Sequence, residues 1–339
     1  MIAITGGGTG GHLVIARVVK EALNQRGIQP IYIGSTAGQD RAWFEEDEGF
    51  EHRYFLESKG VVNQKGLRKL LSLLRIIRES FTCKDIFKKH GITTVFSVGG
   101  YAAAPASLAA LLFGKRLYIH EQNAINGKLN TLLKPFAHTF FSSYDSKATF
   151  TNYPVNKAFF DLQRNRKALR TIIFLGRSQG ATFINNLAMV LAKSLNEKGI
   201  HIIHQTGKKE FEMLKNFYQT EGIKADVFDF SYEMPLKLAQ ADFAISRSGA
   251  STLWELCASS LPALFIPFPH AAANHQYFNA KMLAEKGLAL LEEQSHLDTQ
   301  TILARIENLD LHAISSGLTT TIQYGGSDEI VEALLKNSH

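Results

Sequence analysis

The residues best suited to chemistry in this 339-residue sequence stand at its start. The segment TGGGTGGH, residues 5–12, holds five glycines in six positions and ends on a histidine. Gly6, Gly8 and Gly11 fit the pattern GxGxxG, between the apolar run IAIT and a segment of helical periodicity. In that setting, glycines let the main chain approach a phosphate at the start of a helix. The turn therefore predicts a ligand that carries phosphates or a sugar.

His12 would lie in the first turn of that helix. The positive helix end disfavours an imidazolium, so the ring stays neutral and can accept a proton. His12 is thus a candidate base toward an acceptor hydroxyl, or a group that stabilises a leaving diphosphate. The alternative is a histidine that only supports the loop through hydrogen bonds. We favour a functional role, because titratable side chains gather at functional sites.

Two common nucleotide sites fit this turn poorly. A nicotinamide-binding fold needs an acid about 20 residues farther on, at the end of the second strand, to hold a ribose. That strand ends here in IYIGS, without an acid. A P-loop needs GK[ST] after the glycines, and the sequence has none at this site.

Two more glycine turns, GRSQGA at 176–181 and SRSGAST at 246–252, also join a strand pattern to a helix pattern. One such loop alone is most simply a tight turn. Three of them at the carboxyl ends of strands, where ligands bind in such sheets, favour phosphate or sugar binding.

Short apolar runs alternate with amphipathic segments, which predicts parallel sheets with helices on both faces. The pattern restarts near residues 152–156, where Pro154 interrupts regular structure. We expect an α/β protein with two doubly wound, Rossmann-like domains that face each other across a cleft. Strands are expected within 2–5, 30–35, 93–100, 116–122, 170–176, 200–207, 225–230, 241–250 and 261–268, and helices within 13–27, 104–114, 181–199 and 327–337.

Composition narrows the class of protein. Two cysteines, Cys83 and Cys257, form no CxxC pair, so neither a disulfide framework nor a zinc cluster is expected. Met1 runs directly into the first strand, so we expect no leader peptide. No apolar run reaches the length of about 18 residues that a spanning helix needs. These features predict a soluble cytoplasmic protein, or one attached only to a membrane surface.

The net charge of +6 is concentrated in one segment. Residues 57–89 hold nine Lys or Arg against three acids, an excess of six. The segment also predicts a helix with an apolar stripe and basic flanks. Such a helix could cover the core of its own domain, but the charge favours docking on anionic lipid heads. Nucleic acid is not expected, because no stacking or helix-turn-helix pattern is present. The stripe comprises Leu67, Leu70, Leu71, Leu74, Ile77 and Phe81, and its basic flanks are Arg68, Lys69, Arg75 and Arg78.

Six motifs in one order carry a family resemblance: TGGGTGGH, GGYAAAP, HEQN, GRSQGA, SRSGASTLWE and LPALFIPFPHAAANHQYFNA. Together they resemble the MurG family of bacterial cell-wall glycosyltransferases, over about residues 5–287. The resemblance implies a GT-B fold whose C-terminal helix, about 324–339, packs back on the first domain. It implies an N-terminal acceptor and membrane domain at 1–153 and a UDP-sugar domain at 154–323. The implied reaction moves N-acetylglucosamine from UDP-N-acetylglucosamine to the muramoyl 4-hydroxyl of lipid I, with inversion, at the cytoplasmic face of the membrane.

The resemblance also implies roles for single residues. Glu255 would accept hydrogen bonds from both ribose hydroxyls, although Thr252 and Glu255 also have the spacing of a capping box. Gln276 would read sugar hydroxyls, or be a solvated residue at the start of a helix. The other implied donor contacts are Thr9, Gly10, Gly11, Asn123, Ser178, Ala250, Ser251, Thr252 and Leu253. Tyr101, His120 and Glu121 would contact the acceptor or only order their loops.

Some positions depart from the family pattern. Arg177 stands where the family usually has glycine, and Ser231 replaces an apolar residue near the uracil. The linker reads YPVN, so the family arginine is missing at Asn156. Lys157 or Arg177 could take its place.

The implied chemistry needs no metal or other cofactor. No DxD sequence occurs in the chain, so main-chain amides and helix ends would stabilise the leaving diphosphate. Two other functions stay open. One is a UDP-sugar epimerase or NAD-dependent oxidoreductase on a similar frame, and the other is a non-catalytic membrane adaptor that binds a sugar nucleotide.

Overall fold

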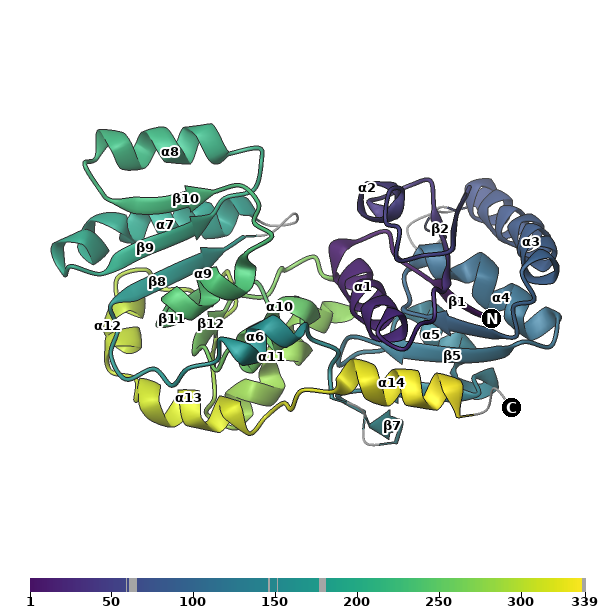
Figure 1. Ribbon diagram of the computed structural model, residues 1–339. Helices are drawn as coiled ribbons and strands as arrows, with labels where there is room; N and C mark the ends of the chain where they lie inside the picture. The colour runs from purple at the N-terminus through teal and green to yellow at the C-terminus, as the bar shows by residue number, and fades with distance from the viewer. Residues whose placement is uncertain (59, 61–65, 146, 151, 177–180, 337–339) are drawn as a thin grey trace. The chain divides into compact units, whose positions relative to one another are not determined.

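A computed structural model of the chain describes residues 1–58, 60, 66–145, 147–150, 152–176 and 181–336, without the side chains of residues 67–69, 150 and 181. It divides into two compact units. The first unit comprises Met1–Val155 with Gly325–His339, and the second comprises Asn156–Tyr324. Each unit has a parallel sheet between helices, as Figure 1 shows. The predicted α/β class with two Rossmann-like halves is confirmed.

Within the described residues, the sheet of the first unit has the strand order β3-β2-β1-β4-β5-β6-β7, and the paired strands are parallel. Its central strands β1, β2 and β4 are buried throughout, which explains why they read as continuous apolar runs. The strands are β1 Ile2–Thr5, β2 Ile31–Ser35, β3 His52–Leu56, β4 Thr94–Ser97, β5 Arg116–Glu121, β6 Thr139–Ser142 and β7 Thr149–Phe150.

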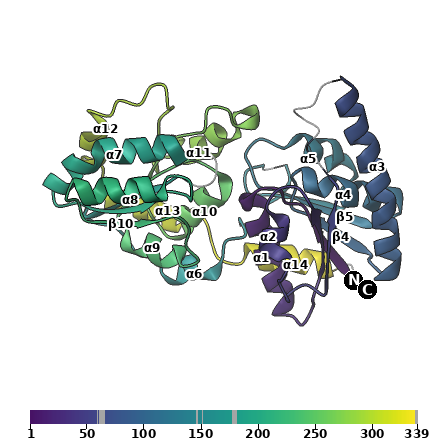
Figure 2. The ribbon, with the colours of Figure 1, turned by 90° about the horizontal axis from the view of Figure 1, so that it is seen from above.

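Helices cover both faces of this sheet. Helices α3 and α4 lie on one face, and α1 and α14 lie on the other (Figure 2). The C-terminal helix α14 is tied to the unit by an ion pair of Arg26 with Asp328 at 2.8 Å. The helices are α1 Gly10–Asn24, α2 Asp40–Phe44, α3 Gly66–Lys89, η1 Tyr101–Ala103, α4 Ala104–Leu112, α5 Lys128–Leu133, η2 Lys134–Phe136 and α14 Gly326–Leu335.

The sheet of the second unit has the order β10-β9-β8-β11-β12-β13, again with parallel pairing in the described residues. Its core includes Leu191 of α7, Ile202 of β9 and Ile306 of α12. The strands are β8 Thr171–Leu175, β9 His201–Gln205, β10 Ala225–Phe228, β11 Phe243–Ser246, β12 Ala263–Phe265 and β13 Leu290–Leu291. The helices are α6 Lys157–Asp161, α7 Ala181–Glu197, α8 Phe211–Thr220, α9 Met234–Gln240, α10 Ala250–Ala258, η3 Ala272–Asn274, α11 His275–Glu285, α12 Ile302–Glu307, α13 Leu311–Thr319.

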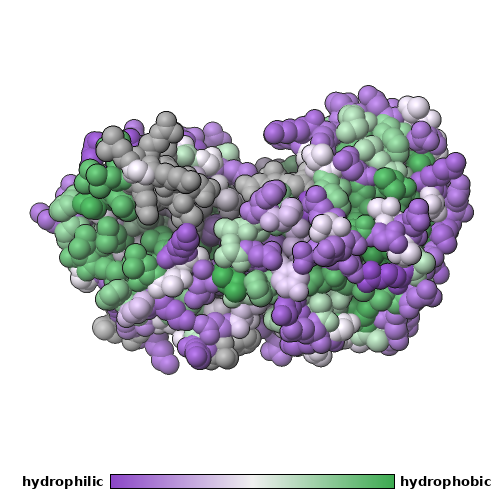
Figure 3. Space-filling view, turned by 180° about the vertical axis from the view of Figure 1, so that it is seen from behind, coloured by the Kyte–Doolittle hydropathy of each residue, from purple (hydrophilic) through white to green (hydrophobic). Residues whose placement is uncertain are grey.

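The two halves of helix α3 have different surroundings. Its C-terminal half packs into the core through Cys83, Ile86 and Phe87. Its N-terminal half exposes an apolar stripe, with Leu71 56% and Leu74 53% exposed. The alternative that the whole stripe covers the core of its own domain is therefore wrong. Hydrophobic residues gather on this margin of the first unit in the space-filling view (Figure 3).

No helix in the described part of the chain combines the length and apolar character needed to cross a bilayer.

Candidate functional site

The first glycine turn joins β1 to α1, and hydrogen bonds fix its main chain. Gly7 N–H donates to Gly99 O at 3.2 Å, and Gly8 N–H donates to Asp40 Oδ2 at 2.6 Å. Thr9 is the N-cap of α1, but its hydroxyl does not cap the helix N–H groups in the described structure. Helix α1 begins at Gly10, three residues before the expected start, so His12 lies in its first turn.

Asp40 is the residue under this turn that the sequence patterns missed. Its carboxylate is fully buried and also accepts hydrogen bonds from Ser35 N at 2.9 Å and Tyr32 Oη at 3.1 Å. Burial raises the pKa of Asp40, although its hydrogen bonds oppose that rise. A carboxylate bonded to Gly8 N–H opposes a second anion at the same amide, so this part of the turn suits a neutral ligand group.

Tyr101 closes the turn from another side. Its hydroxyl donates to Ala37 O at 2.7 Å. Gly8 has φ +82°, and a Cβ there would lie 2.5 Å from the Tyr101 ring. Glycine is therefore required at this position both by the backbone conformation and by the space.

His12 is held at both ring nitrogens. Its Nδ1 lies 2.9 Å from Thr9 Oγ1, and its Nε2 lies 3.0 Å from Gln122 Nε2. The tautomer protonated on Nδ1 satisfies both contacts, because Nδ1–H then donates to Thr9 and Nε2 accepts from the Gln122 amide. The ring is thus presented in a fixed orientation with its lone pair on Nε2.

The HEQN segment, residues 120–123, begins with the last two residues of β5 and continues into the loop after it. The carboxylate of Glu121 organises this segment. It is buried and accepts from Asn123 N at 3.0 Å, Gly127 N at 2.9 Å and Asn130 Nδ2 at 2.8 Å. These bonds tie the loop of residues 122–127 and the first turn of α5 to the end of β5. In this structure Glu121 orders the loop, one of the two roles the sequence left open for it.

His120 lies beneath this loop. Its side chain is fully buried, and neither ring nitrogen has a hydrogen-bond partner in the described residues. Burial, together with the neighbouring His12, lowers the pKa of His120 to about 3. His120 is therefore a neutral ring packed in the core, and its centroid lies 5.6 Å from that of Tyr153.

The third glycine turn joins β11 to α10 in the second unit. Helix α10 begins at Ala250 with Gly249 as its N-cap, and all nine of its residues are buried. Thr252 is therefore the third residue of the helix rather than its N-cap. The capping-box explanation for Thr252 and Glu255 is wrong, and Glu255 is a buried carboxyl in the second turn.

Arg247, in this same turn, received no role from the sequence patterns. Its guanidinium is only 5% exposed and donates to Ile266 O at 3.1 Å, Pro267 O at 3.0 Å and Gln294 Oε1 at 2.9 Å. Burial lowers the pKa of Arg247 to about 10. These bonds tie the turn to the end of β12.

Gln276 orders the loop before α11. Its Oε1 accepts a hydrogen bond from Phe268 N at 2.9 Å, so the side chain is not simply solvated. Ala273 and Asn274 nearby have left-handed φ values of 51° and 53°. Non-glycine residues rarely adopt this conformation, and such strain is often found at functional loops.

The remaining expected site residues differ in how they are placed. Ser178 and Arg177 lie outside the described residues, and so do the side chains of Leu67 and Arg68. Lys157 forms an exposed ion pair with Asp161, four residues on in α6.

Comparison with known proteins adds family evidence to this geometry. Residues 2–142 match the glycosyltransferase family 28 N-terminal domain, and residues 171–320 match the family 28 C-terminal domain.

Two relatives carry the name UDP-N-acetylglucosamine–N-acetylmuramyl-(pentapeptide) pyrophosphoryl-undecaprenol N-acetylglucosamine transferase. One, from Campylobacter fetus, is 52% identical over 99% of this chain and 100% of its own. Another, from Wolinella succinogenes, is 48% identical over 98% of this chain and 99% of its own.

The crystal structure of Acinetobacter baumannii MurG is similar with a TM-score of 0.80 and 26% identity, and the match covers 99% of both chains. The predicted resemblance to the MurG family is thereby confirmed, and the chain belongs to glycosyltransferase family 28.

Proposed function

We propose that this chain transfers N-acetylglucosamine from UDP-N-acetylglucosamine to the muramoyl 4-hydroxyl of lipid I, with inversion at the anomeric carbon. The observation that carries the proposal is the 52% identity over 99% of the chain to a relative named for this transfer. The ordered turns at the starts of α1 and α10 support it, because each presents the N-terminus of a helix beside polar side chains.

The second unit binds the uridine diphosphate. The N–H groups of Ala250, Ser251 and Thr252 in the first turn of α10 face the diphosphate, where the helix dipole favours negative charge. The Glu255 carboxylate offers two acceptor oxygens to the ribose diol. Leu253, Ser178 and Gln276 complete the donor site from this unit, and Gln276 reads the sugar hydroxyls with its amide nitrogen.

The first unit supplies the base and the remaining donor contacts. His12 Nε2 takes the proton of the attacking hydroxyl after the acceptor displaces the Gln122 amide from it. Thr9, Gly10 and Gly11 contact the sugar of the donor. This fits the position of the Asp40 carboxylate beside the turn, which favours a neutral sugar there over an anionic phosphate. Asn123 is a further donor contact, and the loop ordered by Glu121 holds it.

The reaction is a direct displacement. The muramoyl oxygen forms a bond to the anomeric carbon while the bond from that carbon to the diphosphate oxygen breaks. The proton of the hydroxyl passes to His12, and the negative charge leaves with UDP. Helix dipoles and main-chain N–H groups stabilise this developing charge.

We further propose that α3 docks the enzyme on an anionic membrane surface that holds the lipid acceptor. Its exposed apolar residues Leu71 and Leu74 enter the interface, while exposed Arg75 and Arg78 pair with lipid phosphates. We propose that the enzyme lies peripherally at the cytoplasmic face of the membrane.

The test incubates the full chain with radiolabelled UDP-N-acetylglucosamine and a lipid I analogue. We expect label in the lipid product, one UDP released per transfer, and the same rate with a chelator present. His12→Ala should lower kcat by about 10² to 10⁴-fold, the range for a general base. Glu255→Gln should mainly raise KM for the donor.

Each other outcome points elsewhere. Donor binding without transfer would support a membrane adaptor. Reduction of added NAD would support an oxidoreductase, and conversion of the free UDP-sugar to another UDP-sugar would support an epimerase. Any of these without labelled lipid would overturn the proposed transfer.

A further inference from the structure

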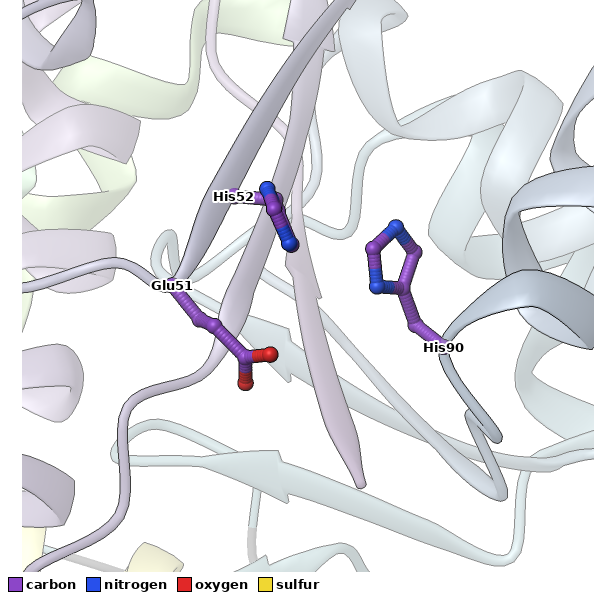
Figure 4. A group of neighbouring side chains, drawn as sticks. All are labelled: Glu51, His52 and His90. Carbon is purple, nitrogen blue, oxygen red and sulfur yellow. The ribbon is translucent and has the colours of Figure 1, made fainter.

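Two histidines and a glutamate meet beside the edge strand of the first unit. Glu51 directly precedes β3, His52 is its first residue, and His90 follows the last residue of α3. One ligand atom from each side chain lies within 4.8 Å of the other two. Figure 4 shows the two rings and the carboxylate turned toward one another. The reaction proposed above uses none of the three.

The main chain holds these residues in place. Glu51 N–H donates to Pro30 O at 3.0 Å, and His52 pairs with Ile31 in the parallel register of β2 and β3. His90 N–H donates to Ile86 O at 3.1 Å and continues the last turn of α3. The three side chains therefore start from backbone that the sheet and the helix already fix.

Tyr54 orients the ring of His90. Its hydroxyl lies 2.7 Å from His90 Nε2, which leaves Nδ1 on the side of Glu51 and His52. Histidines that bind metals usually engage their second nitrogen in such a hydrogen bond. Tyr54 stands two residues after His52, so β3 presents both side chains on the same face. The ring centroids of His52 and His90 are 4.5 Å apart.

We infer that Glu51, His52 and His90 bind one divalent transition-metal ion, for which Zn²⁺ is the fitting probe. Two imidazole nitrogens and one carboxylate oxygen suit Zn²⁺, Co²⁺ or Ni²⁺, whereas Mg²⁺ and Ca²⁺ prefer oxygen ligands. Ligand atoms about 2.0–2.2 Å from zinc stand roughly 3–3.5 Å apart, so small side-chain rotations close the site. Glu51 and His52 are exposed, so an ion can enter and water can fill the remaining positions.

The bound ion links His52 and His90, which stand 38 positions apart in the sequence. It joins the start of the edge strand β3 to the C-terminal end of α3. Because the three ligands meet only in the folded unit, the ion stabilises the folded state by an amount that grows with the logarithm of its concentration over its dissociation constant. Lys89 Nζ, 3.5 Å from Tyr54 Oη, places a positive charge near the site and limits that affinity.

The experiment titrates the full chain, freed of metal with a chelator and then dialysed, with Zn²⁺, Co²⁺ and Mg²⁺. We expect one Zn²⁺ per chain by calorimetry, a rise in unfolding temperature, and visible Co²⁺ absorption typical of nitrogen and oxygen ligands. Mg²⁺ should give none of these. Tyr54→Phe should weaken Zn²⁺ binding by about tenfold, the low end of the effect of losing an orienting partner.

Glu51→Gln, His52→Gln and His90→Gln should each abolish the Zn²⁺-dependent rise in unfolding temperature. The matched control is His312→Gln, an exposed histidine of α13, which should bind like the wild type. A His52→Gln/His90→Gln variant that folds, by circular dichroism, and still binds Zn²⁺ like the wild type would overturn the site. So would a wild-type chain that shows no binding at a several-fold excess of Zn²⁺.

Discussion

Gln122 Nε2 lies 3.0 Å from His12 Nε2, a contact across 110 positions of sequence. It joins the first turn of α1 to the residue just after β5. The glycine turn and the HEQN loop therefore act on the same imidazole. Gln122 is a positioning residue in the proposed reaction, since it orients the His12 ring until the acceptor hydroxyl takes its place at Nε2.

Gln122→Ala should lower kcat/KM for the lipid acceptor by roughly tenfold, less than loss of the base itself, because the contact exists only until the acceptor takes its place. Of its contacts with Thr9 and Gln122, the His12 ring would keep only the one with Thr9, so before the acceptor binds the ring would sample other orientations. KM for UDP-N-acetylglucosamine should change little. Steady-state transfer assays measure both quantities. Gln29→Ala, which removes an exposed glutamine bonded to Glu48 O, is the control and should leave both unchanged. An unchanged kcat/KM for the lipid acceptor in Gln122→Ala would argue against this positioning role.

Asp40→Asn should destabilise the chain by about 1–3 kcal/mol, the usual cost of an unsatisfied buried donor. The carboxylate accepts from both Gly8 N and Ser35 N, on different oxygens, and an amide can accept on only one. Its NH₂ group would face the other main-chain donor. Urea unfolding measures the loss. Asp85→Asn, at an exposed position in α3, is the control, and equal stability of the two variants would contradict the role of Asp40.

Gly8→Ala should cost more than Gly27→Ala, although both glycines have positive φ. Gly27 has φ +73° and no atom within 4 Å of an added Cβ, so alanine there reports only the backbone term of about 1–2 kcal/mol. At Gly8 the Cβ also meets the Tyr101 ring, which adds about 1–3 kcal/mol of overpacking. Thermal unfolding of the two variants gives the difference. Only Gly8→Ala should also lower transferase activity.

Stability should fall in acid partly because of His120. Burial lowers the pKa of His120 to about 3 in the folded chain, whereas an unfolded histidine has a pKa of about 6.5. The contribution of the neutral, buried His120 ring to folding stability is therefore fully present above a pH of about 6.5 and is lost as the pH falls toward about 3. In that window it contributes a slope of about 1.4 kcal/mol per pH unit.

His120→Leu removes the imidazole without breaking a hydrogen bond among the described residues. The free energy of unfolding is measured with urea at several pH values between roughly 7.5 and 4, the range in which histidine titrates. Its slope against pH should be shallower for this variant than for the wild type. His312→Gln, at an exposed site, should keep the wild-type slope. Identical slopes in all three proteins would rule out the buried ring as a source of acid sensitivity.

Leu71→Gln/Leu74→Gln should reduce binding to anionic vesicles while changing stability by less than about 0.5 kcal/mol, as for other surface substitutions. Both side chains are more than half exposed, so the fold does not depend on them. Co-sedimentation with vesicles at low and high salt measures the binding. Arg75→Gln/Arg78→Gln should weaken it mainly at low salt. Val190→Gln, also exposed but in the second unit, should bind as the wild type does.

Much of the fold could be read from the sequence, because the central strands are buried on both faces. Such strands become continuous apolar runs, as in IAIT at β1 and TIIFL at β8. The strands β3, β6, β7 and β13 were not predicted, and β6 was missed although three of its four residues are buried. Strand β3 is half exposed at the sheet edge, and β7 and β13 have two residues each, so their residues carry no strong pattern.

The sequence by itself determined the chemistry on offer: glycine turns at the carboxyl ends of strands, a histidine at the start of a helix, and a basic segment with an apolar stripe. These are local features, because residue type and spacing within a short segment of sequence are enough to define them. The tertiary structure alone decided which groups meet. The pairing of Asp40 with Gly8, Gln122 with His12 and His52 with His90 depends on strand order, which brings distant segments together. It also decided that the α3 stripe faces outward, since a stripe records only that side chains are apolar and not what lies against them.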